Sequence, residues 1–273
     1  MSFQPVIPFG GHAGWAFLGR TKEAQQTAFE AAPLQQRETE YFAAKIGEIT
    51  TAEELVSDRT LLKVALGAFG LDDDISNKFF IQKVLEDGTL TNDALANRLA
   101  DKRYQEFSSA FGFGDFDIPR TQLSEFPGEI IASFNTRQFE IAVGEQNESM
   151  RLALSAERDI ADIAASTNSN DGKWFTIMGT PPLRSVFETA LNLPSSFGTL
   201  DIDKQLEVFK ERASNVLGTD QISDFTNEDT MAELVRVFLA RTEIQGLTSQ
   251  AASGSTALTL LQSAGNISSF FNQ

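Results

Sequence analysis

The chain has 273 residues, a length that suits one large domain or two repeats of ordinary size. With 41% hydrophobic and 22% charged residues it can bury a core, which excludes full disorder for most of the sequence. A formal net charge of -16 argues against binding to the phosphates of nucleic acids and against anionic membrane surfaces.

The first half of the chain predicts an arm followed by helices. Residues 1–13 are rich in Pro and Gly and are expected to form a flexible N-terminal arm. Helical sequence follows over residues 15–49, with Pro33 placed in the first turn of a second helix. Residues 58–69 are apolar around most of a helix circumference, which predicts a central, buried helix that ends at Gly70. Three further helices are predicted: one capped by Thr50 and Thr51, one that begins at Asp72, Asp73 and Asp74, and one that ends at Gly112.

The second half begins with a linker and continues with helices. Pro119 and Pro127 mark a linker over residues 119–135, and a long helix is expected from about residue 136 to residue 166. Residues 242–273 are rich in Ser, Thr, Gln, Ala and Gly and predict a flexible C-terminal tail. No segment alternates strictly between apolar and polar residues, so the predicted fold class is all-α. Between the long helix and the tail, helices are predicted over residues 174–178, 182–192, 203–217 and 228–241.

The two halves of the chain show a similar order of apolar positions. At an offset of 122 residues, Leu61, Val64, Ala65, Ala68, Phe69 and Leu71 align with Leu183, Val186, Phe187, Ala190, Leu191 and Leu193. At an offset of 127 residues, Tyr104, Phe107 and Phe111 align with Met231, Leu234 and Phe238. The pattern predicts two tandem copies of a multi-helix unit packed together, over residues 14–118 and 136–241. Chance agreement between amphipathic helices, which all share one period, is the alternative.

Catalytic, cofactor-binding and metal-binding residues are not predicted at any position. The chain has no Cys, which excludes disulfides, thiolate metal sites and cysteine nucleophiles. His12 is the only histidine, and one imidazole makes no histidine metal site without carboxylate partners. The glycines around His12 lack the spacing of a dinucleotide or phosphate loop and predict a hinge. The acidic residues 72–74, and likewise Asp201 and Asp203, lack the pattern of a calcium loop and are interpreted as helix starts.

Surface features leave some alternatives open. Phe111, Phe113 and Phe116 either form an exposed docking patch or pack in the core and in a turn, and the second interpretation is preferred. The sequence has no run of about 18 apolar residues, so no membrane insertion is expected. Residues 1–14 lack the features of a secretory signal, so the expected location is the cytoplasm, with export by a route that reads no cleaved signal left open.

Several segments resemble a known family. They are residues 58–62 (DRTLL), 65–71 (ALGAFGL), 79–88 (FFIQKVLEDG) and 99–104 (LADKRY) in the first half, and residues 181–184, 190–194 and 200–205 in the second. Together they are similar to the bacterial domain-of-unknown-function family 1217, over roughly residues 5–241. The resemblance implies an all-helical fold of duplicated units. Members of this family often occur beside flagellar genes, and the family supplies no catalytic residues.

Two functional hypotheses follow from these observations. The first is a non-catalytic structural or assembly protein, without cofactor or metal, that is associated with the bacterial flagellum through protein–protein contacts. Signal-less export to the flagellum would be compatible with it. The alternative is a small-molecule binder, or an enzyme of unrecognised chemistry, with a site between the two repeats. A deep, polar-lined pocket there would favour the alternative, and a Phe-filled junction would count against it. The polar residues expected at that junction are Arg59, Arg103, Arg184 and Arg236.

Overall fold

The computed structural model describes residues 3–246 and 248, and every regular element in this part of the chain is a helix. The predicted all-α fold class is therefore confirmed. Short 3-10 helices also occur, and a last helix occupies residues 228–246. In chain order the other helices are α1 (Gly11–Glu30), α2 (Pro33–Lys45), α3 (Ala52–Ser57), α4 (Arg59–Gly67), α5 (Lys78–Asp87), α6 (Leu95–Arg98), α7 (Arg103–Phe111), α8 (Phe126–Gly144), α9 (Glu148–Ala165), α10 (Asn170–Met178), α11 (Pro181–Ala190) and α12 (Ile202–Leu217).

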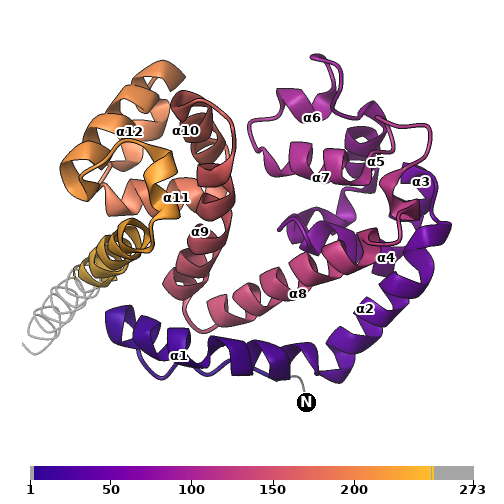
Figure 1. Cartoon of the computed structure of the whole chain (residues 1–273), viewed down its shortest axis with the longest axis horizontal. Helices are drawn as coiled ribbons and strands as arrows, with labels where there is room; N and C mark the ends of the chain where they lie inside the picture. The colour runs from indigo at the N-terminus through magenta and orange to yellow at the C-terminus, as the bar shows by residue number, and fades with distance from the viewer. Residues whose placement is uncertain (1–2, 247, 249–273) are drawn as a thin grey trace, which may run out of the picture.

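The helices form two groups on either side of a corner made by α8 and α9 (Figure 1). Helices α2 to α7 pack together, with α2 and α4 against α8, and together with the first half of α8 they are called the N-terminal lobe here. Helices α9 to α12 and the helix at residues 228–246 pack with the second half of α8 and are called the C-terminal lobe. Helix α1 runs beneath the corner and contacts both α8 and α9.

The N-terminal lobe is organised around α4, which is the buried helix that the sequence predicts. Asp58 caps this helix by accepting hydrogen bonds from the backbone N–H groups of Thr60 at 2.8 Å and Leu61 at 3.0 Å. The preceding helix α3 begins with a capping box, in which Thr51 and Glu54 each accept a hydrogen bond from the backbone N–H of the other. The core of this lobe includes Phe42, Leu55, Leu62, Phe107, Phe111 and Phe134.

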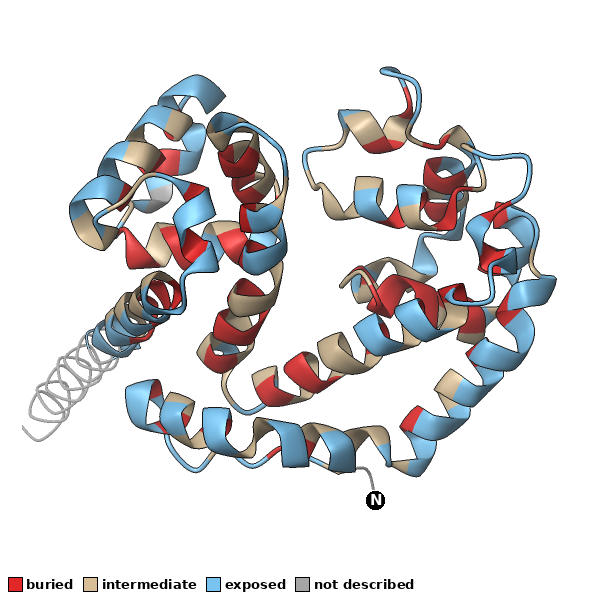
Figure 2. Cartoon of the chain, viewed as in Figure 1, coloured by how far each residue is buried: buried red, intermediate tan, exposed pale blue. Residues whose placement is uncertain are grey.

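The C-terminal lobe has a separate core around Trp174 of α10. The indole ring is fully buried, and its centroid lies 5.2 Å from the ring of Phe187 and 5.7 Å from the ring of Phe209. Its Nε1–H donates a hydrogen bond of 2.9 Å to the carbonyl oxygen of Asp220. Because this donor is satisfied, the large ring is buried without leaving an unpaired polar atom. Figure 2 shows the buried residues inside both lobes and the exposed residues on their outer faces.

Helix α8 joins the two cores and corrects two predictions about this region. Phe134 lies in the core of the N-terminal lobe, whereas Phe139 lies in the core of the C-terminal lobe. The second half of the linker expected over residues 119–135 is helical, because Pro127 sits in the first turn of α8, where a missing N–H costs nothing. The single helix expected over residues 136–166 is two helices: the chain turns after Gly144, and Asn147 caps α9 by accepting from the N–H of Met150 at 3.1 Å.

The described part of the N-terminal arm, residues 3–10, lies against the folded chain. The amide of Gln25 on α1 accepts a hydrogen bond from the Val6 N–H at 2.6 Å and donates to the Val6 carbonyl at 3.3 Å. Gln146 donates to the carbonyl of Pro5. Helix α1 begins at Gly11, a few residues earlier than expected, and its Leu18 packs in the core of the C-terminal lobe. The predicted tail over residues 242–273 continues the last helix to residue 246, and most of it falls outside the described residues.

The acidic run at residues 72–74 does not begin an α-helix as expected. It forms a 3-10 helix, Asp72–Ser76, and α5 starts only at Lys78. The reason is tertiary: Asp72 accepts a hydrogen bond of 2.7 Å from Gln138 of α8, and Asp74 accepts one from the hydroxyl of Tyr104 on α7.

The aligned positions of the predicted repeat lie at the centre of each lobe. Leu61 of α4 and Leu183 of α11 are both buried, as are Phe107 of α7 and Leu234 of the last helix. Two unrelated amphipathic helices would also bury their aligned apolar positions, because each helix turns its apolar face toward a core. The tandem duplication therefore stays a prediction.

Candidate functional site: the cleft between the lobes

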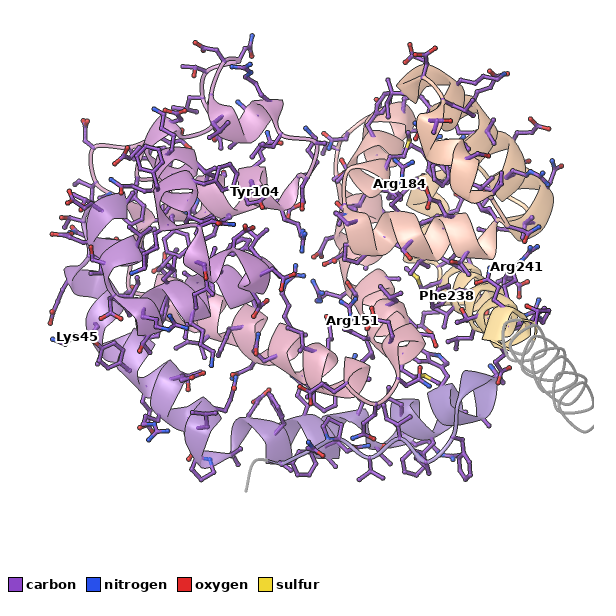
Figure 3. The ribbon with its side chains drawn as sticks, turned by 180° about the vertical axis from the view of Figure 1, so that it is seen from behind. Lys45, Tyr104, Arg151, Arg184, Phe238 and Arg241 are labelled. Carbon is purple, nitrogen blue, oxygen red and sulfur yellow. The ribbon has the colours of Figure 1, made fainter. Side chains whose placement is uncertain are left out.

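A polar cleft of about 410 Å³ opens between the two lobes, within the size range of small-molecule sites. Its walls come from α7 in the N-terminal lobe, from α8 and α9 at the corner, and from the start of α11 in the C-terminal lobe. Side chains that end in nitrogen or oxygen atoms project into this opening from both lobes (Figure 3). The lining includes three arginines and three acidic residues, which are Arg103, Arg137, Arg158, Glu106, Asp159 and Asp162.

The lobes also touch on the far side of the cleft from the α8–α9 corner. The backbone N–H of Lys102 donates a hydrogen bond of 3.1 Å to the carbonyl oxygen of Gly179, at the end of α10. A Cβ atom at Gly179 would lie only 2.8 Å from the carbonyl oxygen of Ala100 and 3.0 Å from the side chain of Lys102. Only glycine therefore permits this approach of the two backbones. The contact closes the cleft at the end opposite the corner.

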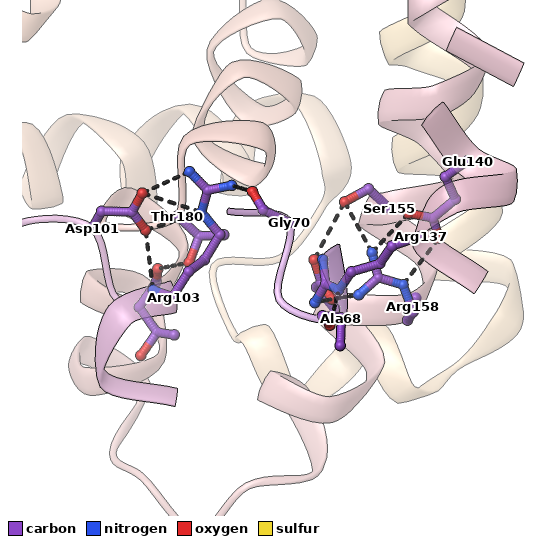
Figure 4. Close-up of polar contacts among 11 residues, drawn as sticks. Ala68, Gly70, Asp101, Arg103, Arg137, Glu140, Ser155, Arg158 and Thr180 are labelled. Atoms are coloured by element: carbon purple, nitrogen blue, oxygen red, sulfur yellow. Dashed lines mark hydrogen bonds and ion pairs between the residues drawn. The ribbon is translucent and has the colours of Figure 1, made fainter. Parts of the chain in front are cut away.

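Arg103, one of the four arginines expected at the junction, projects from the first turn of α7 into the cleft. Its Nε lies 3.1 Å from both carboxylate oxygens of Asp101, and its Nη2 lies 2.7 Å from Oδ2 of the same residue (Figure 4). Its Nη1 donates to the carbonyl oxygen of Gly70, just beyond the end of α4. The bidentate pair with Asp101 thus orients the guanidinium toward the C-terminal end of a buried helix.

Arg137 of α8 reaches the same helix end and also contacts the other lobe. Its Nε donates a hydrogen bond of 2.8 Å to the carbonyl oxygen of Ala68, and its Nη2 lies 3.4 Å from Oδ1 of Asp159 on α9. Burial lowers the pKa of the Arg137 guanidinium, and the charge of Asp159 opposes that shift. The side chain therefore links the end of α4 to the C-terminal lobe at the cost of a partly desolvated charge.

Arg158 continues this network along α9. It forms a bidentate pair with Glu140 of α8, with Nε to Oε1 at 3.0 Å and Nη2 to Oε2 at 2.8 Å, and its Nη1 contacts Asp159. Glu140 is buried, with 6% of its surface exposed, so its charge needs this partner. Asp159 pairs with both Arg137 and Arg158 and also accepts a hydrogen bond of 3.3 Å from Ser155.

Glu106 faces the cleft from α7 and, like Asp162 of α9, has a carboxylate without a bonded partner in the described chain. Its backbone N–H donates to the carbonyl oxygen of Lys102 at 3.1 Å, but no hydrogen bond or ion pair joins its carboxylate to a residue of the described chain. The cleft walls raise the pKa of its carboxyl group by desolvation, and the negative charge of Asp159 raises it further, while Arg137 opposes both effects.

The other residues considered from the sequence lie elsewhere. Arg59 lines a separate hollow on the N-terminal lobe, beside Lys63 and Glu38. Arg184 lies within the C-terminal lobe (Figure 3), where it contacts Glu188 and Gln205 at 2.7 Å each. At the surface, Arg236 pairs with Glu233, and His12 is exposed on α1. Asp201 and Asp203 flank the start of α12. Of the three phenylalanines, Phe111 is buried, Phe113 is half-buried and Phe116 is exposed.

Sequence reasoning missed the residues that make most of the cleft. Arg137 and Glu140 are three positions apart on α8, and Ser155, Arg158 and Asp159 share one face of α9. One sequence signal could have identified these five residues. They are polar or charged residues that lie beside the apolar stripe of a helix predicted to be central. That signal does not say which charge on one helix meets which charge on the other.

Within residues 3–246 and 248, no three His, Asp or Glu side chains gather in a way that could hold a metal ion. None of the helices in the described chain is both long enough and apolar enough to cross a membrane.

The fold and the cleft define a two-lobed, all-helical protein with a polar cleft between its lobes. The profile of the family described as "Protein of unknown function (DUF1217)" matches residues 68–231, and the chain belongs to this family. It is also similar to the crystal structure of an Agrobacterium tumefaciens protein determined by a structural genomics consortium, with a TM-score of 0.72 and 26% sequence identity, over 89% of this chain and 99% of that chain. The comparison with curated proteins gives no significant match.

Proposed function

We propose that the protein is a non-catalytic structural or assembly protein that acts through protein–protein contacts and is associated with the bacterial flagellum. The flagellar part of the proposal is supported by the family resemblance, since members of that family often occur beside flagellar genes. The contact part is supported by three exposed apolar side chains on two loops of the N-terminal lobe that Asp115 joins. We call these three residues, Leu90, Phe116 and Ile118, the apolar corner.

The apolar corner is the observation that carries the proposal. Leu90, Phe116 and Ile118 are 73%, 52% and 68% exposed, although large apolar side chains gain most from burial. The carboxylate of Asp115 holds the two loops together by accepting hydrogen bonds from the Thr89 N–H at 2.6 Å, the Thr89 hydroxyl at 2.8 Å and the Leu90 N–H at 3.2 Å. A surface held in place before binding loses less conformational entropy on association, which favours a partner that covers it.

The test is deletion of the gene in its native host, scored for swimming and for filaments by electron microscopy. We expect loss of both, restored by the wild-type gene. The double variant Leu90→Ser/Phe116→Ser should restore neither, because it removes apolar contact area while changing the free energy of unfolding by only about 0.5 kcal/mol per surface site. The control is Ile202→Ser, which changes an apolar residue that is 51% exposed on the other lobe. It should restore both, and immunoblots would verify equal protein levels.

Two outcomes would contradict separate parts of the proposal. Normal swimming and normal filaments in the deletion strain would remove the flagellar association. Full restoration by the double variant would show that the apolar corner is not the contact surface.

A second candidate function is a small-molecule binder whose site is the cleft. The observation that favours it is the polar lining of the junction, because the phenylalanine cores lie to either side and leave the junction itself open. This candidate concerns a different surface from the apolar corner, so the two can be tested independently.

A further inference from the structure

The terminal nitrogens of two cleft arginines approach the same side of Gly70. Gly70 has a positive φ of +67°, and the position where a Cβ atom would stand lies 3.4 Å from Nη1 of Arg103 and 3.4 Å from Nη1 of Arg137. Nη1 of Arg137 donates no hydrogen bond to any atom of the described chain, whereas its Nε and Nη2 are both bonded. Two guanidinium groups that face one point, with donors to spare, are suited to bind a carboxylate.

The same cleft holds an acid that no cation of the chain neutralises directly. Glu106 belongs to α7, like Arg103, and feels the charges of Arg103 and Arg137, yet it forms no ion pair with either of them. The Glu106 side chain is exposed and its carboxylate lacks a partner, so a bound ammonium group would supply the missing charge and donate hydrogen bonds to it.

The balance of charge in the lining decides between classes of ligand. Three arginines line the cleft with Glu106, Asp159 and Asp162, and Asp101 and Glu140 pair with two of these arginines, so a simple anion would meet the carboxylates and a simple cation would meet the guanidinium groups. A molecule with no net charge but with separated positive and negative groups avoids both repulsions.

We infer that the cleft binds a small zwitterion that carries one carboxylate and one ammonium group, as a free amino acid does. The carboxylate lies between Arg103 and Arg137 beside Gly70, and the ammonium group lies against Glu106. This assignment deepens the second candidate function, a binding site in the cleft, and does not depend on any flagellar role.

The test is calorimetric titration of the full chain with each of the common L-amino acids. We expect at least one to bind with a dissociation constant below about 1 mM, and to raise the Tm by about 5 °C at one hundred times that concentration. Two analogues of that amino acid test the two charges separately. Its decarboxylated amine lacks the carboxylate, and its N-acetyl derivative lacks the ammonium charge. Each should bind at least about tenfold more weakly, because each leaves one charge of the cleft unpaired.

Three variants locate the site. Glu106→Gln removes the ammonium partner and should weaken binding about tenfold or more. Ser133→Trp fills the cleft from an exposed position of α8 that makes none of the ion pairs, and should abolish binding. Glu129→Gln makes the same amide change as Glu106→Gln at an exposed position of α8 outside the cleft, and should leave binding unchanged.

Several results would overturn the inference. They are the absence of binding by any amino acid, equal binding of the amine or the N-acetyl acid, and unchanged binding by Glu106→Gln. If Ser133→Trp failed to give the circular dichroism spectrum of the wild type, Glu106→Gln alone would decide. Loss of amino-acid binding in Glu106→Gln together with normal complementation of the gene deletion would separate this inference from the flagellar proposal.

Discussion

The two lobes and the cleft between them differ in how their side chains are stabilised. The cores around α4 and Trp174 are made of aliphatic and aromatic side chains in close contact, and burial of apolar area is their main source of stability. The cleft is lined by charged side chains in ion pairs that solvent partly reaches, and such pairs contribute little net stability. The cores therefore stabilise the lobes, whereas the cleft network constrains how the lobes lie relative to each other.

Within the cleft, a local and a long-range pair show the same contrast on a smaller scale. Asp101 and Arg103 are two residues apart and belong to one lobe, so their pair orients a single guanidinium. Arg137 and Asp159 belong to different helices, and Asp159 is shared with Arg158, which also holds Glu140. Only the second group connects α8 with α9 and so constrains the angle of the corner between the lobes.

The largest effect is expected from a change in a core. Trp174→Ala should lower the free energy of unfolding by about 3–5 kcal/mol, because it removes a fully buried ring and leaves a cavity next to Phe187 and Phe209. Urea titration followed by circular dichroism measures it. The matched variant is Trp15→Ala, whose ring on α1 is only partly buried and should cost clearly less. Equal losses in the two variants would contradict the assignment of Trp174 to the centre of a core.

An intermediate effect is expected from the cleft network. Glu140→Ala leaves Arg158 without its bidentate partner in a partly buried position and should cost about 2 kcal/mol by the same urea titration. Glu148→Ala breaks the exposed pair with Arg151 and should cost less than about 1 kcal/mol. If both variants lost the same small amount, Arg158 and Glu140 would be an ordinary surface pair and not a constraint on the corner.

The smallest effect concerns pH. The pKa of Glu106 is raised in the folded state by desolvation and by Asp159 and Asp101, with Arg137 and Arg103 opposing the shift. A raised acid pKa means that the folded chain binds the proton more tightly than the unfolded chain, so this stabilisation is present at low pH and is lost as pH rises through the raised value. Glu106→Gln should therefore gain stability relative to the wild type between about pH 4 and about pH 8, by less than about 1 kcal/mol because solvent screens the site.

Thermal unfolding of Glu106→Gln, the wild type and Glu129→Gln across this pH range measures the effect. The control variant should follow the wild type at every pH. A gain for Glu106→Gln that is largest at low pH would have the wrong sign and would show that the carboxyl group is stabilised in its charged form.

Much of the fold was open to prediction because the interactions that form helices are local. The capping box of Thr51 and Glu54 and the continuous apolar surface of α4 involve residues at most a few positions apart. Predictions failed where local signals were read without their tertiary partners. Pro127 was read as part of a linker although it suits the first turn of α8, and the acidic run at residues 72–74 forms a 3-10 helix whose side chains are held by Gln138 and Tyr104.

Local patterns in the amino-acid sequence are enough to predict an all-helical chain, the place of its central helix and its family resemblance. The existence of the polar cleft, and the identity of the charges that line it, follow from the three-dimensional packing. Arg103 bonds to Gly70 across 33 positions, Arg137 to Ala68 across 69 and Arg137 to Asp159 across 22. Helix periodicity says which residues share a face, but it does not say which faces meet. The pairing of charges in the cleft therefore depends on how α8 and α9 are placed relative to each other, and no local pattern of the sequence specifies that arrangement.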